Sequence, residues 1–219
     1  LTLKDDGFIA PPRTGQRNWL LNRFIREAAA DLEALDAIAR RFAPGADAGP
    51  AGIGPEKDMR HADLDDQEIM EDWQQPLMEA MADIAGVPGG AVLEVGFGRG
   101  VASDLLQARG LGSHTIIECN PSVIRRFEDW RQQYPNSEID VVDGLWQDVM
   151  PGLGTFDAIF FHTYALDEDE AVERLSSVTF ADNFFPVAAE HLEEGGVFTY
   201  LTSEIDSLGR AHQRLLFEH

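Results

Sequence analysis

One stretch of the 219-residue chain constrains its fold more than any other: residues 92–100, Val-Leu-Glu-Val-Gly-Phe-Gly-Arg-Gly. An apolar run ends there in Gly-x-Gly-x-Gly, which is typical of a buried strand that turns sharply into a helix where a ligand approaches the backbone. Glu118 closes a second apolar run 22 positions after Gly96. An acidic residue at the end of the next strand can accept hydrogen bonds from two ribose hydroxyls. The pairing predicts a nucleoside pocket at the carboxyl edge of a parallel sheet.

The glycine spacing also narrows the class of ligand. The pattern differs from the Gly-x-Gly-x-x-Gly of dinucleotide-binding turns, which weakens an interpretation as an NAD-dependent oxidoreductase. No Lys-Ser or Lys-Thr follows the glycines, so the phosphate-cradling P-loop is absent from this turn. A ribose-binding acid without phosphate-binding residues suits S-adenosylmethionine, the commonest cofactor of this kind.

Apolar runs and turn residues predict the architecture. We expect strands near 91–95, 114–118, 138–142, 156–161 and 196–201, alternating with helices. Asn120-Pro121 is typical of a helix start, and Gly195-Gly196 predicts a helix stop that feeds the last strand. The alternation predicts an α/β fold: a doubly wound, Rossmann-like, mostly parallel sheet with helices on both faces and a helical N-terminal extension.

The two ends of the chain carry separate expectations. Residues 1–64 are expected to form the extension, with an amphipathic helix over 16–42 and a flexible linker over 43–58 that lets it act as a lid. The main domain is expected over 65–219, and Pro76 should split or kink a helical stretch over 65–85. After a helix near 207–218, no antiparallel hairpin follows. We expect either a truncated chain or an open sheet edge that favours a homodimer.

Charge and cysteine content exclude some partners. The formal net charge is −22, from 17 basic and 39 acidic residues, which makes nucleic acids and anionic membrane surfaces poor partners. The single cysteine, Cys119, fits a reducing compartment and is expected to be a small buried hydrophobe. With no long apolar run, the chain is expected to be soluble and cytoplasmic, and to act on a small molecule. The six histidines show no metal-ligand spacing.

Several segments together resemble one family, guanidinoacetate N-methyltransferase and its arginine-methylating relatives. The Glu-Val-Gly-Phe-Gly, Ile-Glu-Cys-Asn and Gly-Leu-Trp combination carries the resemblance most specifically. The matching segments are residues 70–78, 93–98, 116–120, 144–149, 156–164 and 192–200.

The resemblance implies a class I methyltransferase that uses S-adenosylmethionine. It implies that Gly96 and Gly98 lie under the methionine portion of the cofactor and that Glu118 holds the ribose. Trp146 suits the adenine slot because a flat aromatic wall favours a heterocycle, although a core role is also open. The residues implied to bind cofactor are Glu94, Gly96, Gly98, Glu118, Gly144, Leu145 and Trp146. Those implied to bind substrate are Trp73, Gln74, Met78, His162, Thr163 and Tyr164, with His162 and Tyr164 catalytic.

The chain departs from the family at two positions that bear on the substrate. The guanidino-methylating enzymes carry Asp where this chain has His162, and Glu where it has Gln74. Two carboxylates suit a guanidinium, and burying that cation without them is costly. A neutral acceptor, such as an indole or a cyclic dipeptide, is therefore expected.

Two alternative functions and the role of His162 stay open at this point. One is a guanidino N-methyltransferase that uses other acids such as Glu71 or Asp72. Another is a nucleoside-binding protein without catalysis. For His162, the open roles are general base, binding group and structural residue.

Overall fold

The computed structural model describes most of the chain from residue 59 onward. The described residues are 2–3, 9–10, 59–64, 66–70, 72–166, 170, 179, 181–202 and 208–219. The amphipathic helix expected over 16–42 and the linker expected over 43–58 lie outside the described residues. Near the N-terminus, β1 (Thr2–Leu3) and β2 (Ile9–Ala10) form a short antiparallel pair.

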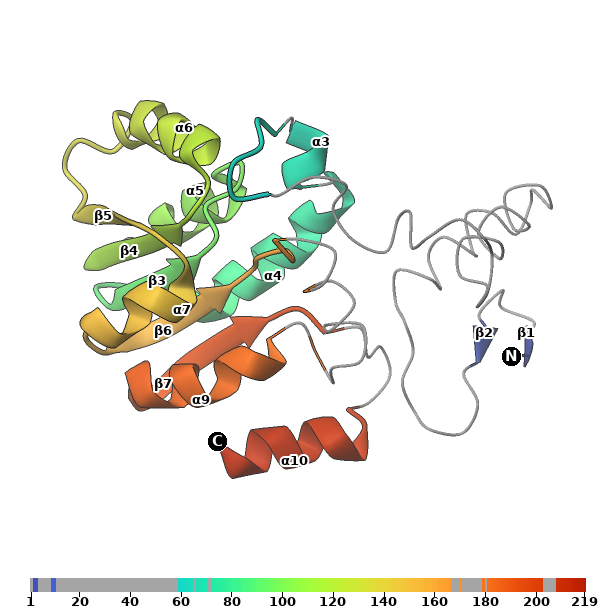
Figure 1. Ribbon diagram of the computed structural model, residues 1–219. Helices are drawn as coiled ribbons and strands as arrows, with labels where there is room; N and C mark the ends of the chain where they lie inside the picture. The colour runs from blue at the N-terminus through green and yellow to red at the C-terminus, as the bar shows by residue number, and fades with distance from the viewer. Residues whose placement is uncertain are drawn as a thin grey trace, which may run out of the picture.

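A five-stranded parallel sheet forms the centre of the domain (Figure 1). Its strand order is β5-β4-β3-β6-β7, so the order reverses at β3. The carboxyl ends of the strands beside such a reversal form the crevice in which α/β sheets bind ligands. The strand bounds are Ala91–Val95 for β3, Ser113–Glu118 for β4, Ile139–Asp143 for β5, Phe156–Phe161 for β6 and Leu192–Tyr200 for β7. The first four strands confirm the prediction to within one residue at either end.

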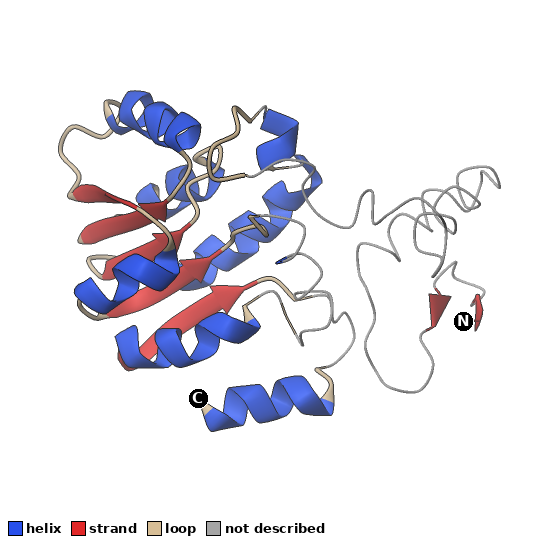
Figure 2. Ribbon diagram, in the orientation of Figure 1, coloured by secondary structure: helices blue, strands red, loops and turns tan. Residues whose placement is uncertain are grey.

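Helices cover both faces of the sheet, as the fold class predicts (Figure 2). On one face lie α4 (Gln75–Ala85), α5 (Val101–Gln107) and α6 (Pro121–Arg131), preceded by α3 (Asp66–Ile69) and the 3-10 turn η1 (Asp72–Gln74). On the other face lie α7 (Trp146–Val149), η2 (Met150–Gly152), η3 (Asp182–Phe184) and α9 (Phe185–His191). The last helix, α10 (Arg210–Glu218), lies beside the β7 edge, where Tyr200 Oη is 2.6 Å from His212 Nε2.

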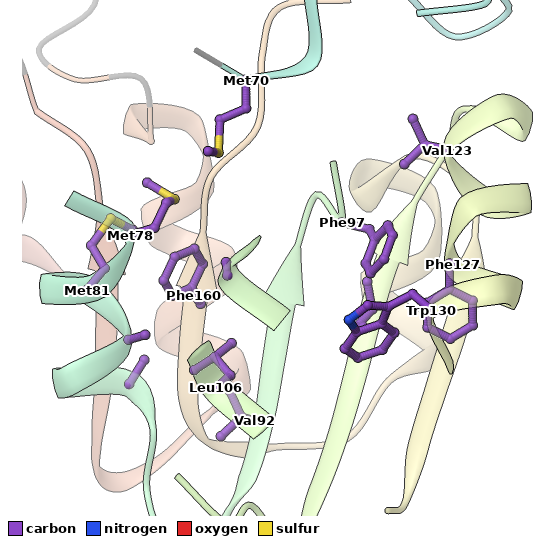
Figure 3. Close-up of a cluster of buried hydrophobic side chains, with 14 of the residues drawn as sticks. Met70, Met78, Met81, Val92, Phe97, Leu106, Val123, Phe127, Trp130 and Phe160 are labelled. Atoms are coloured by element: carbon purple, nitrogen blue, oxygen red, sulfur yellow. The ribbon is translucent and has the colours of Figure 1, made fainter. Parts of the chain in front are cut away.

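Alternate side chains of each strand point to opposite faces, so each face has its own core. On the α4–α6 face, Met78 and Leu106 pack against Val92 and Phe160, all of them buried (Figure 3). Opposite them, Leu93 and Ile159 point into an aromatic group on the α7–α9 face. There the ring centroids of Phe161 and Phe184 are 4.5 Å apart. Strands buried on both faces explain why the sequence shows continuous apolar runs rather than alternation.

Two sequence-based boundaries differ from the structure. Gly195-Gly196 does not end a helix, because α9 ends at His191 and β7 already begins at Leu192. The pairing of β6 with β7 shifts register between Phe156 and Ala158, so the glycines lie in an irregular part of the strand. The helical stretch over 65–85 is split, as expected, but near residue 70. Pro76 instead lies in the first turn of α4, where its missing N–H has no helical partner to lose.

Candidate functional site

A cleft opens at the carboxyl ends of β3, β4 and β6, where the strand order reverses. It consists of two adjoining cavities of about 690 and 340 Å³, including the space at their open mouths. Both are lined by Gly96, Glu118, Cys119, Thr163, Tyr164 and Leu166, so they form one continuous site. A cleft of this size is in the range that holds a nucleoside cofactor together with a small acceptor.

The glycine turn after β3 forms the floor of the cleft. Gly96 has a φ of 94°, a left-handed conformation that side chains rarely adopt. A Cβ on Gly96 would lie 2.5 Å from the backbone oxygen of His162, so the position has no room for one. Phe97 then turns into the core against Phe127 and Trp130, which fixes the loop from below (Figure 3). The turn therefore presents bare backbone to a ligand.

Glu118 is placed at the end of β4, as predicted, and is held by backbone amides. Its Oε1 accepts hydrogen bonds from the N–H groups of Cys119 (2.8 Å) and Asn120 (2.9 Å), and its Oε2 accepts one from Phe97 (3.1 Å). Burial raises the pKa of this carboxyl above its ordinary value, and the backbone hydrogen bonds offset part of that effect. A carboxylate offers about four acceptor positions. The carboxyl group lines both cavities, so a hydroxyl donor in the cleft, such as that of a ribose, can reach it.

Cys119 lines both cavities beside Glu118 and is half-buried. Burial, followed by the negative charge of Glu118, raises the pKa of its thiol to about 12. The thiol stays protonated at neutral pH and is not a reactive nucleophile.

The segment after β5 forms the wall of the smaller cavity. Gly144 and Leu145 line it with Trp146, as predicted. Trp146 also packs edge-on against Phe184, with ring centroids 5.0 Å apart, at the border of the aromatic core. Trp146 therefore lines the cleft and also borders the aromatic core, and its contact with adenine stays a prediction.

Glu94 is the one predicted cofactor-binding residue that lines neither cavity. Its side chain is fully buried on the α4–α6 face, where Ser103 Oγ donates a hydrogen bond of 2.6 Å to Oε2. The Nε2 of buried His114 lies 3.0 Å from the same oxygen, and Gln107 contacts the other ring nitrogen of His114 at 3.0 Å. The structure thus places Glu94 in a buried polar network beneath the glycine turn.

The acceptor end of the cleft is built by the residues after β6 together with α4. His162, Thr163, Tyr164 and Met78 line the larger cavity. Gln74, predicted to bind substrate, lines neither cavity; it is 5% exposed and lies behind Tyr164, to whose Oη its Nε2 donates a hydrogen bond of 2.5 Å. The Oε1 of Gln74 is buried and has no hydrogen-bond partner in the described part of the chain. The side chain of Trp73, also predicted to bind substrate, lies outside the described residues.

His162 directly follows β6, and its N–H donates a hydrogen bond of 3.2 Å to the backbone oxygen of Val95. Its ring lies edge-on to Tyr164, with ring centroids 5.8 Å apart. Burial lowers the pKa of His162 to about 4, because the charged imidazolium is poorly solvated there. The imidazole is therefore neutral at physiological pH, which leaves one ring nitrogen free to accept a proton or a hydrogen bond.

Residues 59–72, excluding 65 and 71, form a roof over the cleft. Residues 59–64 belong to the extension that was expected to act as a lid, whereas the part that later residues take in the roof was not predicted. Met59, Leu64, Ile69 and Met70 line the larger cavity from above. Three polar side chains of the domain hold the roof in place. Asn120 Nδ2 donates to the backbone oxygens of Met59 and Ala62, Arg126 Nη2 to that of Leu64, and Arg99 Nη1 to that of Met70. In the sequence, the only sign of this part of the roof is that apolar residues stand between acidic ones at 64–70.

Neither a metal-binding cluster nor a membrane-spanning helix is present in the parts of the chain that the structure describes. No three His, Cys, Asp or Glu side chains converge there in a way that could hold a metal ion. No helix among those residues is long and apolar enough to cross a membrane.

A parallel sheet that reverses order at β3, a glycine turn after that strand and an amide-held acid after the next one define an α/β domain of the class I methyltransferase type. The chain belongs to the guanidinoacetate N-methyltransferase family, whose sequence model, Guanidinoacetate N-methyltransferase, matches residues 48–213. The match covers more than half of the chain and confirms the family resemblance drawn from the motifs.

Curated relatives fall in the same group. The chain is 32% identical over 113 residues to protein arginine N-methyltransferase 2 of Emericella nidulans, a match covering 48% of this chain and 26% of the relative. It is 29% identical over 143 residues to the Yarrowia lipolytica protein of the same name, covering 60% and 28%. The match thus spans about a quarter of the length of these relatives.

The solved structures are more distant. A ribosomal protein L11 methylase from Lactobacillus delbrueckii subsp. bulgaricus is 21% identical with a TM-score of 0.44, and the match covers 59% of this chain and 61% of that one. This likeness is too weak to add to the family assignment.

Proposed function

We propose that this protein transfers a methyl group from S-adenosylmethionine to a neutral small molecule that carries an N–H or an electron-rich ring, such as an indole or a cyclic dipeptide. The observation that carries the proposal is the contrast between the two ends of the cleft. A carboxylate is built into the ribose end, whereas the acceptor end presents His162, Thr163, Tyr164 and Met78.

The cofactor half of the proposal is supported by the fit of the residues present. Gly96 and Glu118 line both cavities, and Trp146 offers an aromatic wall to the smaller one. When bound, the cofactor supplies an electrophilic methyl group on a sulfonium. The protein then has to orient the acceptor in line with that methyl and to exclude water, and both tasks depend on positioning.

The acceptor half is supported by charge and hydrogen bonding. No carboxylate other than Glu118 lines the larger cavity among the described residues. The neutral imidazole of His162, which lines the larger cavity, suits a neutral N–H donor because it can accept one hydrogen bond. Gln74 lines neither cavity and supports the acceptor end only through its hydrogen bond to Tyr164.

Guanidino N-methylation is the second candidate, and family membership favours it. It needs acids other than those of the family at positions 74 and 162. Asp72, one of the two acids considered, has a side chain that is 74% exposed and pairs with Arg99 rather than lining the cleft. Glu71 lies outside the described residues.

Replacing Glu118 with alanine should weaken the binding of S-adenosylhomocysteine by about 1–3 kcal/mol, because hydrogen bonds from the ribose to a charged acceptor are lost. Isothermal titration calorimetry measures the change. Asp140→Ala, which removes an exposed acid from neighbouring β5, is the matched control and should bind as the unaltered protein does. Equal affinities of Glu118→Ala and the unaltered protein would contradict the role of Glu118.

One assay tests the whole proposal. The purified protein is incubated with methyl-labelled S-adenosylmethionine and a panel of indoles, cyclic dipeptides, guanidinoacetate, arginine peptides and amines. Labelling of a neutral acceptor in preference to guanidinoacetate is the expected result. Efficient labelling of guanidinoacetate would replace the proposed acceptor with the second candidate. Cofactor binding without labelling of any acceptor would favour a nucleoside-binding protein without catalysis.

A further inference from the structure

Arg99 is the only lysine or arginine that lines either cavity among the described residues. It stands in the glycine turn, between Gly98 and the first turn of α5. The other ionisable groups of the larger cavity carry no positive charge at neutral pH, because Glu118 is an acid, Cys119 stays a thiol and His162 stays neutral. Among the described residues, Arg99 is therefore the fixed cation in the lining of the cleft, and Arg60 lies close enough for its charge to act on Cys119 without lining either cavity.

The position of the Arg99 side chain is fixed by two contacts. Its Nη1 donates to the backbone oxygen of Met70 at 3.0 Å and to Asp72 Oδ1 at 2.7 Å. The side chain of Arg99 is 24% exposed, whereas that of Asp72 is 74% exposed. Because Asp72 faces solvent, water screens its charge, and this pair neutralises the guanidinium only in part.

The contacts of Arg99 leave one edge of the guanidinium available. A guanidinium has five N–H donors, and both contacts use Nη1. The Nε and Nη2 donors make no hydrogen bond to the residues that the structure describes. That edge of the fork has the geometry that binds both oxygens of a carboxylate.

We propose that Arg99 binds the carboxylate of the amino-acid end of S-adenosylmethionine, so that the cofactor is held at its ribose by Glu118 and at its carboxylate by Arg99. The assignment rests on the proposed function. It follows from the position of Arg99 in the same turn as Gly96 and Gly98, and from the cost of bringing a carboxylate into a cleft that no other lysine or arginine of the described residues lines. Arg99 is then a binding and positioning residue that fixes the direction of the sulfonium methyl.

The test compares three ligands by isothermal titration calorimetry: S-adenosylhomocysteine, its decarboxylated analogue and methylthioadenosine, which lacks the whole amino-acid end. Arg99→Gln should weaken S-adenosylhomocysteine about ten- to hundredfold, the loss typical of a charge-assisted hydrogen-bonded pair. The affinities for the other two ligands should stay within about twofold. Arg99→Lys keeps the charge without the fork and should fall between.

A matched control distinguishes two possible roles of Arg99: binding the cofactor's carboxylate and holding the roof in place. Arg126 also donates to the roof, at the backbone oxygen of Leu64 (2.6 Å), but it lines neither cavity. Arg126→Gln should therefore change the three affinities by similar factors, if it changes them at all. Equal weakening of all three ligands by Arg99→Gln would show that Arg99 only holds the roof, and would overturn the proposal.

The same measurements separate two possible sources of the carboxylate. Should Arg99→Gln bind all three ligands normally and instead raise the KM of a carboxylate-bearing acceptor, Arg99 would serve the acceptor and the assignment to the cofactor would be wrong. An unaltered protein that binds none of the three ligands would overturn the proposed function itself. The unaltered protein could also prefer S-adenosylhomocysteine to the two ligands without a carboxylate. If Arg99→Gln kept that preference in full, only the role of Arg99 would be overturned.

Discussion

Replacing Gly96 with alanine is expected to abolish cofactor binding and to lower the free energy of unfolding by about 2–5 kcal/mol. Two costs add: about 1–2 kcal/mol for a side chain at a φ of 94°, and about 1–3 kcal/mol for overpacking. The added Cβ meets the backbone oxygen of His162, and neither β3 nor β6 can shift without disturbing the centre of the sheet. Urea unfolding measures the first effect, and calorimetry with S-adenosylhomocysteine measures the second.

Gly154→Ala is the matched control for this variant. Gly154 is exposed, and a Cβ built on it meets nothing within 4 Å. Its stability and ligand affinity should match those of the unaltered protein to within about 0.5 kcal/mol. If Gly96→Ala bound the ligand with unchanged affinity, the turn would not be the place where the cofactor approaches the backbone.

Replacing His162 with alanine is expected to lower turnover about 10²–10⁴-fold while cofactor affinity stays nearly intact. The reason is that His162 lines the acceptor end of the cleft and can accept the acceptor's proton as the methyl group is transferred. His219→Ala, which removes an exposed histidine at the end of α10, should leave turnover unchanged. Full activity of His162→Ala on the best acceptor would show that His162 has no role in catalysis.

The pH dependence of turnover gives this prediction a second readout. Only the neutral imidazole can accept a proton, and burial lowers the pKa of His162 to about 4 from its ordinary 6.5. Turnover should therefore rise with pH through about 4 and stay level across neutral pH, and the rise should vanish in His162→Ala. An inflection near 6.5 in the unaltered protein would show that the imidazole is solvated in the working enzyme. His162→Gln, which keeps a hydrogen bond but cannot take up the proton, separates a base from a binding group.

The strands could be predicted from sequence because their signals are local. Each of the first four is an apolar run with a clear end, and β4 ends at Glu118 beside the Asn-Pro helix start. The start of β7 could not be predicted in this way. Glycines at 195 and 196 normally end helices, yet here pairing with β6 extends the strand back to Leu192. Pairing between strands that are distant in the sequence outweighed the local preference of the glycines. Such pairing cannot be read from a single amino-acid sequence.

The same distinction applies to the site. Motif position was sufficient for Gly96, Glu118 and Trp146, which line the cleft at the expected strand ends. It was not sufficient for Glu94, because the direction of its side chain depends on Ser103 and His114 on neighbouring elements. The contacts that fix the roof could not be predicted for a related reason, since those to Asn120 and Arg126 join residues about 60 positions apart.

Asn120 forms hydrogen bonds to three parts of the molecule: the start of α6, the roof and Glu118. Its Oδ1 accepts hydrogen bonds from the N–H groups of Ser122 (2.7 Å) and Val123 (3.3 Å) at the start of α6. Its Nδ2 holds the roof, and its own N–H donates to Glu118. Aspartate would keep an oxygen for the helix start but lose both side-chain donors to the roof, and serine would keep only one donor, on a shorter side chain. An amide of this length is therefore required at position 120, and a substitution that suits the helix alone comes at the expense of the cleft.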